Sequence, residues 1–198
     1  KILELEVGNI VDTNEPLIWI LNKANNAHAA VVGTTGSGKT HLVKDLLVQL
    51  MEQTRSNLPF IFFDYARGDV AGDTNFLRTT KARVVDLPNT PVPLSPFPAC
   101  RTQIEVNQQA HHVAKIFRDV APHIGIVQEQ RLVAAVQQCY QDSQGDPPDF
   151  YDLRSVVDAT GDVDSLTGVL RKLTDLNLFP SRQTDKPLQV KEVLARSW

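Results

Sequence analysis

The sequence lacks the features that would place it in a secreted, membrane or metal-bound class. Its only two cysteines, Cys100 and Cys139, stand on different segments without metal-ligand spacing, so we expect two reduced thiols rather than a disulfide. No run approaches the roughly 20 apolar residues that span a bilayer, and no basic-then-apolar leader opens the chain. We therefore expect a cytoplasmic protein without a membrane partner.

The charge shows no strong excess of either sign. Twenty Lys and Arg residues stand against 23 Asp and Glu, for a net charge of -3. This excludes a basic surface over the whole protein but permits a local nucleic-acid groove. One basic cluster, Arg78, Lys81 and Arg83, has the chemistry to contact DNA phosphates, although a solvated loop is the simpler interpretation.

An initiator methionine is also missing, because the chain starts at Lys1 and its only methionine is Met51. The chain stops at Trp198, directly after an apparent helix and without a capping signal. We expect from this a piece of a longer protein.

The first part of the chain, residues 1–86, alternates between strand and helix patterns. Apolar residues alternate with acids over 2–8, and 17–21 forms a second apolar run, so both segments are predicted as strands. A short run at 29–32 precedes an amphipathic helix over 42–51, and the continuous run 60–63 is typical of a buried parallel strand. Strand, helix and strand at this spacing predict a βαβ unit with a parallel sheet.

The rest of the chain has different sequence patterns. Residues 87–101 are rich in proline and predict an extended connector. Residues 102–198 are predicted to be mainly helical, with apolar faces over 106–117, 132–140 and 166–176. Asp149, with Asp152 three residues later, predicts the N-cap of another helix that ends near Ala159.

The strongest motif is a complete eight-residue phosphate loop after the run 29–32. Glycines let the backbone curl so that its N–H groups face an anion, and the helix that follows presents its positive end to the same anion. A lysine then reaches the β- and γ-phosphates, and a hydroxyl coordinates Mg²⁺. We therefore predict that Mg-ATP binds here, with Lys39 on the phosphates, Thr40 on the metal and His41 beside them. The predicted nucleotide-binding residues are Gly33, Thr34, Thr35, Gly36, Ser37, Gly38, Lys39, Thr40 and His41.

Asp64 follows the apolar run 60–63 and permits three interpretations. It could hold the magnesium water, as in compact kinase- or GTPase-type proteins. It could end the second strand of a RecA-like motor, in which the catalytic glutamate comes later. It could also simply cap the turn 65–69. No apolar run ending in Asp-Glu follows it in this sequence, so the motor interpretation places the catalytic carboxylate outside this chain.

The residues from His28 to Thr40 resemble the HerA/FtsK group of hexameric DNA-translocating ATPases, which open their core with a histidine, a short strand and a Thr-Gly-Ser-Gly-Lys loop. Residues 63–69 and 93–97 are similar to that group's second-strand turn and Asn-Pro-Phe segment, with Ser95 in place of Asn. Residues 149–179 and 190–198 resemble its paired helices and its approach to a central strand.

This resemblance implies a RecA-like P-loop NTPase core, α/β in class, with a partial parallel sheet and a helical subdomain. It implies ATP and Mg²⁺ as cofactors, DNA as a partner of the full-length protein, and a homohexamer. The long helical part is similar to the ATPase subunit of phosphorothioation-dependent DNA restriction systems, which implies further restriction or repair subunits. The trans-acting arginine and the catalytic glutamate of such motors are not located in this sequence, so we expect the chain alone to be poorly active.

Two rival functions remain open. A stand-alone kinase or GTPase-like switch would use Asp64 on magnesium, but the sequence has neither a guanine-reading Asn-Lys-x-Asp motif nor an arginine-rich lid. A non-hydrolysing interaction module would use bound nucleotide only to support its fold.

Overall fold

The computed structural model describes residues 2–182 apart from 27, 66, 67 and 88. These residues fall into two compact units that divide between Val84 and Val85, and each is described by itself below. No helix in the described part of the chain combines the length and the apolar character needed to cross a bilayer. The predictions at Arg67 and at residues 190–198 lie outside the described residues.

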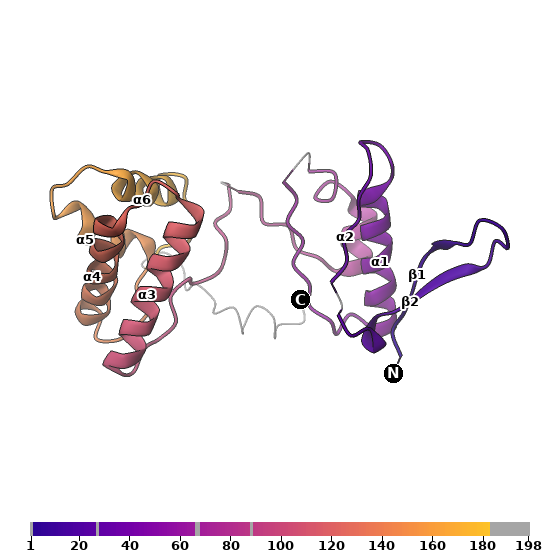
Figure 1. Ribbon diagram of the computed structural model, residues 1–198, viewed down its shortest axis with the longest axis horizontal. Coiled ribbons are helices and arrows are strands. Elements are labelled where there is room, and N and C mark those ends of the chain that lie inside the picture. Colours follow the sequence, from indigo (N-terminus) through magenta and orange to yellow (C-terminus); the bar gives the residue numbers. More distant parts are fainter. Residues whose placement is uncertain (1, 27, 66–67, 88, 183–198) are drawn as a thin grey trace. The chain divides into compact units, whose positions relative to one another are not determined.

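The first unit opens with a β-hairpin (Figure 1). Strand β1, Glu4–Asn9, pairs antiparallel with β2, Pro16–Ile20, with a bulge between Glu6 and Gly8. The backbone N–H of Ile10 donates to Glu15 O at 2.8 Å and closes the turn. The two strands predicted over 2–8 and 17–21 are confirmed, and a short 3-10 helix, Leu21–Lys23, follows them.

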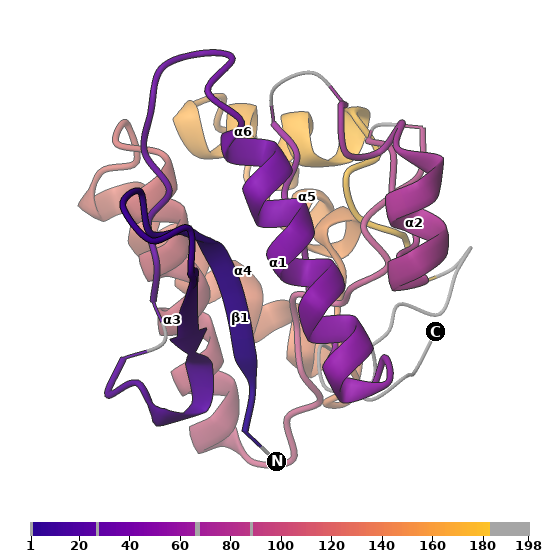
Figure 2. The ribbon, with the colours of Figure 1, turned by 90° about the vertical axis from the view of Figure 1, so that its right-hand side faces the viewer.

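Two helices complete this unit. Helix α1, Lys39–Thr54, begins in the phosphate loop, and the short α2, Thr74–Thr80, packs against it. The hairpin and α2 lie on different sides of α1 (Figure 2). The rings of Phe60 and Phe76 meet edge-on, with 6.3 Å between their centroids. Few apolar side chains are buried among the described residues of this unit; they are Leu5, Met51, Val70 and Phe76.

Two glutamines of α1 hold the outer edge of β1. The side-chain amide of Gln49 accepts from Glu6 N at 2.8 Å and donates to Glu6 O at 3.0 Å. Gln53, one turn later, accepts from Glu4 N at 3.0 Å and donates to Glu4 O. We call these four hydrogen bonds the amide clasp. It joins the hairpin to the helix that begins at the phosphate loop.

The predicted strands at 29–32 and 60–63 are not seen. Both segments are described without strand pairing, and Val32, Ile61 and Phe63 expose 87%, 54% and 70% of their surface. An apolar run becomes a strand only when a neighbour supplies its ladder hydrogen bonds. The described residues provide no such neighbour, so the fold is α/β in composition while the predicted parallel sheet is not observed.

The second unit is helical, as the apolar periodicities predicted. Its helices are α3, Gln103–Val120; α4, Ile126–Asp142; α5, Phe150–Asp158; and α6, Ser165–Asp175. The predicted capping box of α5 is confirmed, because Asp149 accepts from Asp152 N and Asp152 accepts from Asp149 N. A second capping box joins Thr102 and Glu105 at the start of α3, and the backbone N–H groups of Arg101 and Thr102 lower the pKa of Glu105.

The proline-rich segment belongs to this unit's core. Phe97 is fully buried and lies 5.3 Å from the ring of Phe150, and the Tyr140 hydroxyl donates to Pro98 O at 2.7 Å. Both cysteines are free, as predicted, and both are buried. Burial raises the pKa of the Cys139 thiol to about 12, so it is an inert core residue. The clustered core residues are Phe97, Cys100, Val106, Ala110, Val113, Ala114, Phe117, Ile124, Leu132, Ala135, Val136, Cys139, Tyr140, Phe150, Leu153, Val157, Leu166 and Leu170.

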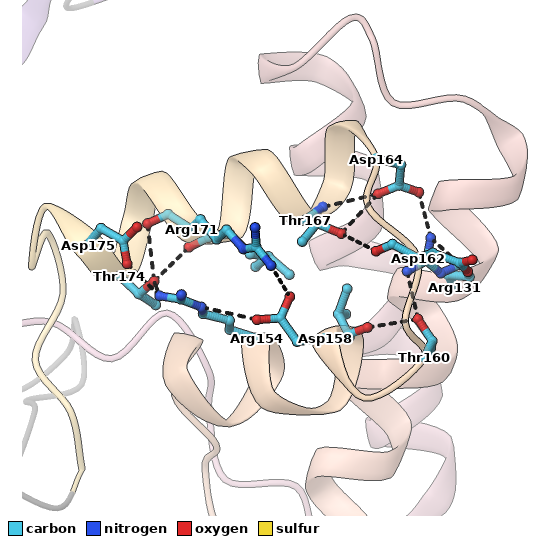
Figure 3. A network of polar contacts seen from close by, with 12 residues as sticks. Arg131, Arg154, Asp158, Thr160, Asp162, Asp164, Thr167, Arg171, Thr174 and Asp175 are labelled. Atoms are coloured by element: carbon cyan, nitrogen blue, oxygen red, sulfur yellow. Dashed lines mark hydrogen bonds and ion pairs between the residues drawn. The ribbon is translucent and has the colours of Figure 1, made fainter.

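Ion pairs fasten α6 to its neighbours (Figure 3). Arg131 of α4 pairs with Asp164, the N-cap of α6. Burial alone would raise the pKa of Asp164, but the Thr167 N–H and the Arg131 charge outweigh it and lower that pKa. Arg154 of α5 pairs with Asp175 at the other end of α6. Each end of α6 is therefore tied to a different helix.

Candidate nucleotide-binding site

The loop before α1 has a backbone that only glycine adopts easily. Gly36 and Gly38 have φ angles of 83° and 85°, in the left-handed region that disfavours residues with a Cβ. Gly38 is the N-cap of α1 and accepts from Leu42 N at 2.9 Å. The loop therefore runs directly into the helix and leaves the first N–H groups of α1 without intrahelical partners.

Gly33 lies close to the side chain of another loop residue. A Cβ at this position would lie 2.5 Å from Ser37 Oγ, which is closer than real Cβ contacts allow. The loop also folds on itself, because Ser37 N donates to Thr34 O at 3.2 Å. A side chain at position 33 would therefore require the Ser37 hydroxyl to rotate away.

Lys39 points back into the loop. Its ammonium donates to Gly33 O at 2.8 Å and to Thr34 O at 2.7 Å. The third donor of this ammonium remains for an anion. The cation, the glycine-only turns and the N-terminus of α1 therefore meet at one place, and this donor set fits a phosphate chain.

The two residues after Lys39 diverge. Thr40 lies exposed in the first turn of α1. His41 Nε2 lies 3.4 Å from Asp45 Oδ2, one helical turn further on. The predicted contacts of Thr40 with magnesium and of His41 with nucleotide stay predictions, as does the ligand role of the exposed Thr34, Thr35 and Ser37.

Asp64 caps a turn. Its Oδ2 accepts from Val70 N at 3.1 Å, and the side chain is exposed. Among the described residues, no hydrogen bond or ion pair joins it to the phosphate loop. The turn-capping interpretation is thus seen directly, and the two magnesium-related interpretations stay predictions.

Sequence reasoning missed an ion pair behind the loop. Lys44 of α1 pairs with Asp73, which also caps α2 by accepting from Phe76 N at 2.9 Å. The Lys44 hydrogen bond is the first cause of a lowered pKa at Asp73. An N-cap signal was present at Asp73-Thr74-Asn75-Phe76, but the helix is too short for its period to show.

A protein-made metal cluster is not found in the described part of the chain, where no three His, Cys, Asp or Glu side chains gather. Magnesium bound with a nucleotide does not need one, because phosphates and waters supply most of its ligands. The loop residues therefore fit Mg-ATP without further carboxylates.

The chain was compared with known protein families and with curated proteins. Residues 5–193 match the family model described as "Helicase HerA, central domain". The match includes the phosphate loop, both ends of α1 and all of the helical unit. A search of curated proteins found no match.

Proposed function

The chain belongs to the HerA helicase central-domain family, and on this premise we propose that it supplies the ATP site of a motor that moves along DNA. The observation that carries the proposal is the loop Gly33–Thr40, whose backbone, lysine and helix start converge at one place. Family membership favours the ATPase over a kinase or GTPase-like switch.

Each loop residue has a defined task in this proposal. The backbone N–H groups between Gly33 and Gly38 receive the phosphates, and Lys39 donates its third ammonium N–H to a phosphate oxygen. Thr40 offers its hydroxyl to Mg²⁺. When bound, the metal neutralises charge on the β- and γ-phosphates.

Nucleotide binding is tested with Lys39→Ala. Loss of a charge-assisted phosphate contact should weaken binding of a slowly hydrolysed ATP analogue at least tenfold, about 1.4 kcal/mol. Lys23→Ala, which removes a lysine outside the loop, is the matched control. Unchanged affinity in Lys39→Ala, measured by calorimetry, contradicts the nucleotide site.

Turnover is the second part of the proposal. The sequence has no apolar run ending in Asp-Glu after Asp64, so this chain alone should hydrolyse ATP barely above background. Robust steady-state hydrolysis that disappears in Asp64→Asn would favour the compact kinase or GTPase-like alternative and remove the motor.

Assembly and DNA are the third part. We expect the full-length protein to form hexamers and to hydrolyse ATP faster when double-stranded DNA is added. The net charge of -3 predicts that this chain alone binds DNA weakly. Sedimentation with and without nucleotide tests the hexamer, and hydrolysis rates with and without DNA test the coupling. If the protein is strictly monomeric and its hydrolysis rate does not change with DNA, the nucleotide-site proposal still holds but the translocase proposal is contradicted.

A narrower assignment follows from the helical unit. In its described residues this unit has four helices, and this long helical part resembles the ATPase of phosphorothioation-dependent restriction. We propose that role, with other restriction subunits as partners. Disrupting the phosphate loop in cells should abolish restriction of unmodified plasmid, measured as transformation efficiency; unaltered restriction contradicts it.

A further inference from the structure

The β-hairpin of the first unit carries an acidic and apolar surface. Residues 2–20 contain four acids and no Lys or Arg, and all four acids are exposed. Val11 at the hairpin tip exposes 96% of its surface, and Leu17 and Ile18 of β2 are also exposed. Apolar side chains surrounded by one sign of charge are typical of a protein interface rather than of a simple solvated strand. The acids are Glu4, Glu6, Asp12 and Glu15.

The segment Arg78–Val84 carries the complementary chemistry. Arg78, Lys81 and Arg83 are exposed, and no acid stands between Arg78 and Val84. Val84 exposes 42% of its surface and supplies an apolar contact beside the charges. Arg78 also donates to Asn75 at 2.9 Å, which directs its guanidinium back toward the first turn of α2.

Geometry separates these two surfaces within one copy. The hairpin packs on α1 through β1, and α2 packs on α1 from another side (Figure 2). The acidic hairpin and the basic segment therefore lie on different sides of α1 in one copy, and each can contact a neighbouring copy. A contact between unlike patches repeats head to tail, and such contacts generate rings when the rotation closes. A two-fold contact of hairpin with hairpin would instead oppose acids with acids.

The hairpin is also held in a fixed position for docking. The amide clasp ties Glu4 and Glu6 to Gln53 and Gln49 of α1. An arm that is ordered before binding loses less conformational freedom when it docks. Because α1 begins at Lys39, the same arm is connected to the helix that holds the nucleotide.

We propose that the β1–β2 hairpin of one copy docks on the segment Arg78–Val84 of a second copy of this chain. The inference rests on the ring assembly proposed above and names the surface that forms it. Charge complementarity and the exposed apolar residues on both patches favour a second copy over other occupants.

The test is a charge exchange in the full-length protein. Asp12→Lys with Glu15→Lys, and separately Arg78→Glu with Lys81→Glu, should each weaken assembly at least tenfold in sedimentation. All four substitutions together should restore assembly, because opposite charges again face each other across the contact. The control, Asp119→Lys with Asp146→Lys, makes the same charge change as the hairpin variant but on the helical unit, and should leave assembly unaltered.

Affinity for the ATP analogue shows that each variant is folded, since none of these residues lies in the phosphate loop. Hexamers that form equally well in all variants overturn this surface and leave the proposed ATPase standing. Reduced DNA affinity in Arg78→Glu with Lys81→Glu, with assembly intact, assigns the basic segment to DNA phosphates and also overturns it. A wild-type protein that does not assemble contradicts both the proposed ring and the proposed contact.

Discussion

The two units of this chain are stabilised in different ways. In the helical unit, eighteen clustered side chains from the proline-rich segment and all four helices form one buried core. Among the described residues of the first unit, four apolar side chains are buried, and the elements are joined by the amide clasp and by the Lys44–Asp73 pair. Several large apolar residues of its extended segments lie exposed.

This difference indicates that the stability of the two units depends differently on binding. A unit with a full apolar core owes its stability to its own packing. A unit held by few apolar contacts and by polar contacts gains more from whatever binds it, since binding to the folded state alone adds directly to stability. The nucleotide-binding unit is thus expected to respond to ligand and neighbours, while the helical unit stays constant.

The largest effect should come from the helical core. Leu153 of α5 is fully buried, so Leu153→Ala should lower the free energy of unfolding of this unit by about 2–5 kcal/mol. Leu176→Ala, at a half-exposed position, is the control and should change it by less than about 0.5 kcal/mol. Denaturant unfolding followed by circular dichroism measures both. Loss of nucleotide binding in Leu153→Ala would break the comparison, because the units would then depend on each other.

Bound nucleotide should stabilise the first unit and leave the helical unit unchanged. At a hundredfold excess over Kd, an ATP analogue should stabilise the first unit by about 2.7 kcal/mol. Hydrogen exchange followed by mass spectrometry should show the added protection in residues of the first unit only. Equal protection of α3–α6 would contradict this difference, and Lys39→Ala should remove the effect altogether.

The amide clasp should contribute less. Gln49→Leu with Gln53→Leu removes the polar partners of Glu4 and Glu6, at a cost of about 1–2 kcal/mol for opening of the β1 edge. The exchange of the Glu4 and Glu6 amide hydrogens, measured by NMR, should therefore become roughly tenfold faster. Glu52→Leu, at an exposed position of the same helix, should leave both rates unaltered. Unchanged rates in the double variant would show that apolar packing alone holds the hairpin.

The smallest effect concerns the Lys44–Asp73 pair. Asp73→Asn keeps an N-cap for α2 but removes the charge. Because the pKa of Asp73 is lowered in the folded protein, the pair stabilises above about pH 4 and its contribution disappears as pH falls through the folded-state pKa. The stability difference between wild type and Asp73→Asn should therefore shrink in acid. A difference that stays constant with pH contradicts an ionic contribution, and Asp12→Asn, an exposed acid of the hairpin, is the control.

Local signals in the sequence predicted most of the helices. The periodic apolar faces of α3–α6 and the caps at Asp149 and Asp152 depend on neighbouring residues, and the structure confirms them. The segments 29–32 and 60–63 could not be predicted in this way, because an apolar run does not reveal whether a second strand lies beside it.

The part of the candidate site that could be predicted from the sequence is the phosphate-loop motif. The spacing of Gly33, Gly36, Gly38 and Lys39 identifies the loop, and the observed φ angles and lysine contacts fit it. The partners of the loop's helix could not be predicted. Gln49 and Gln53 have the composition of a solvated helix face, and only the fold brings the β1 backbone within reach of their amides.

The amide clasp has a consequence for the solubility of the hairpin. Residues four apart on a helix are separated by about 6 Å along its axis, and alternate residues of a strand by about 6.6 Å. Two glutamines at this interval can thus imitate the peptide groups of an adjacent strand, and at β1 they satisfy backbone groups that would otherwise recruit another chain. The helix thereby ends the sheet on that side and protects this edge against amyloid-like growth.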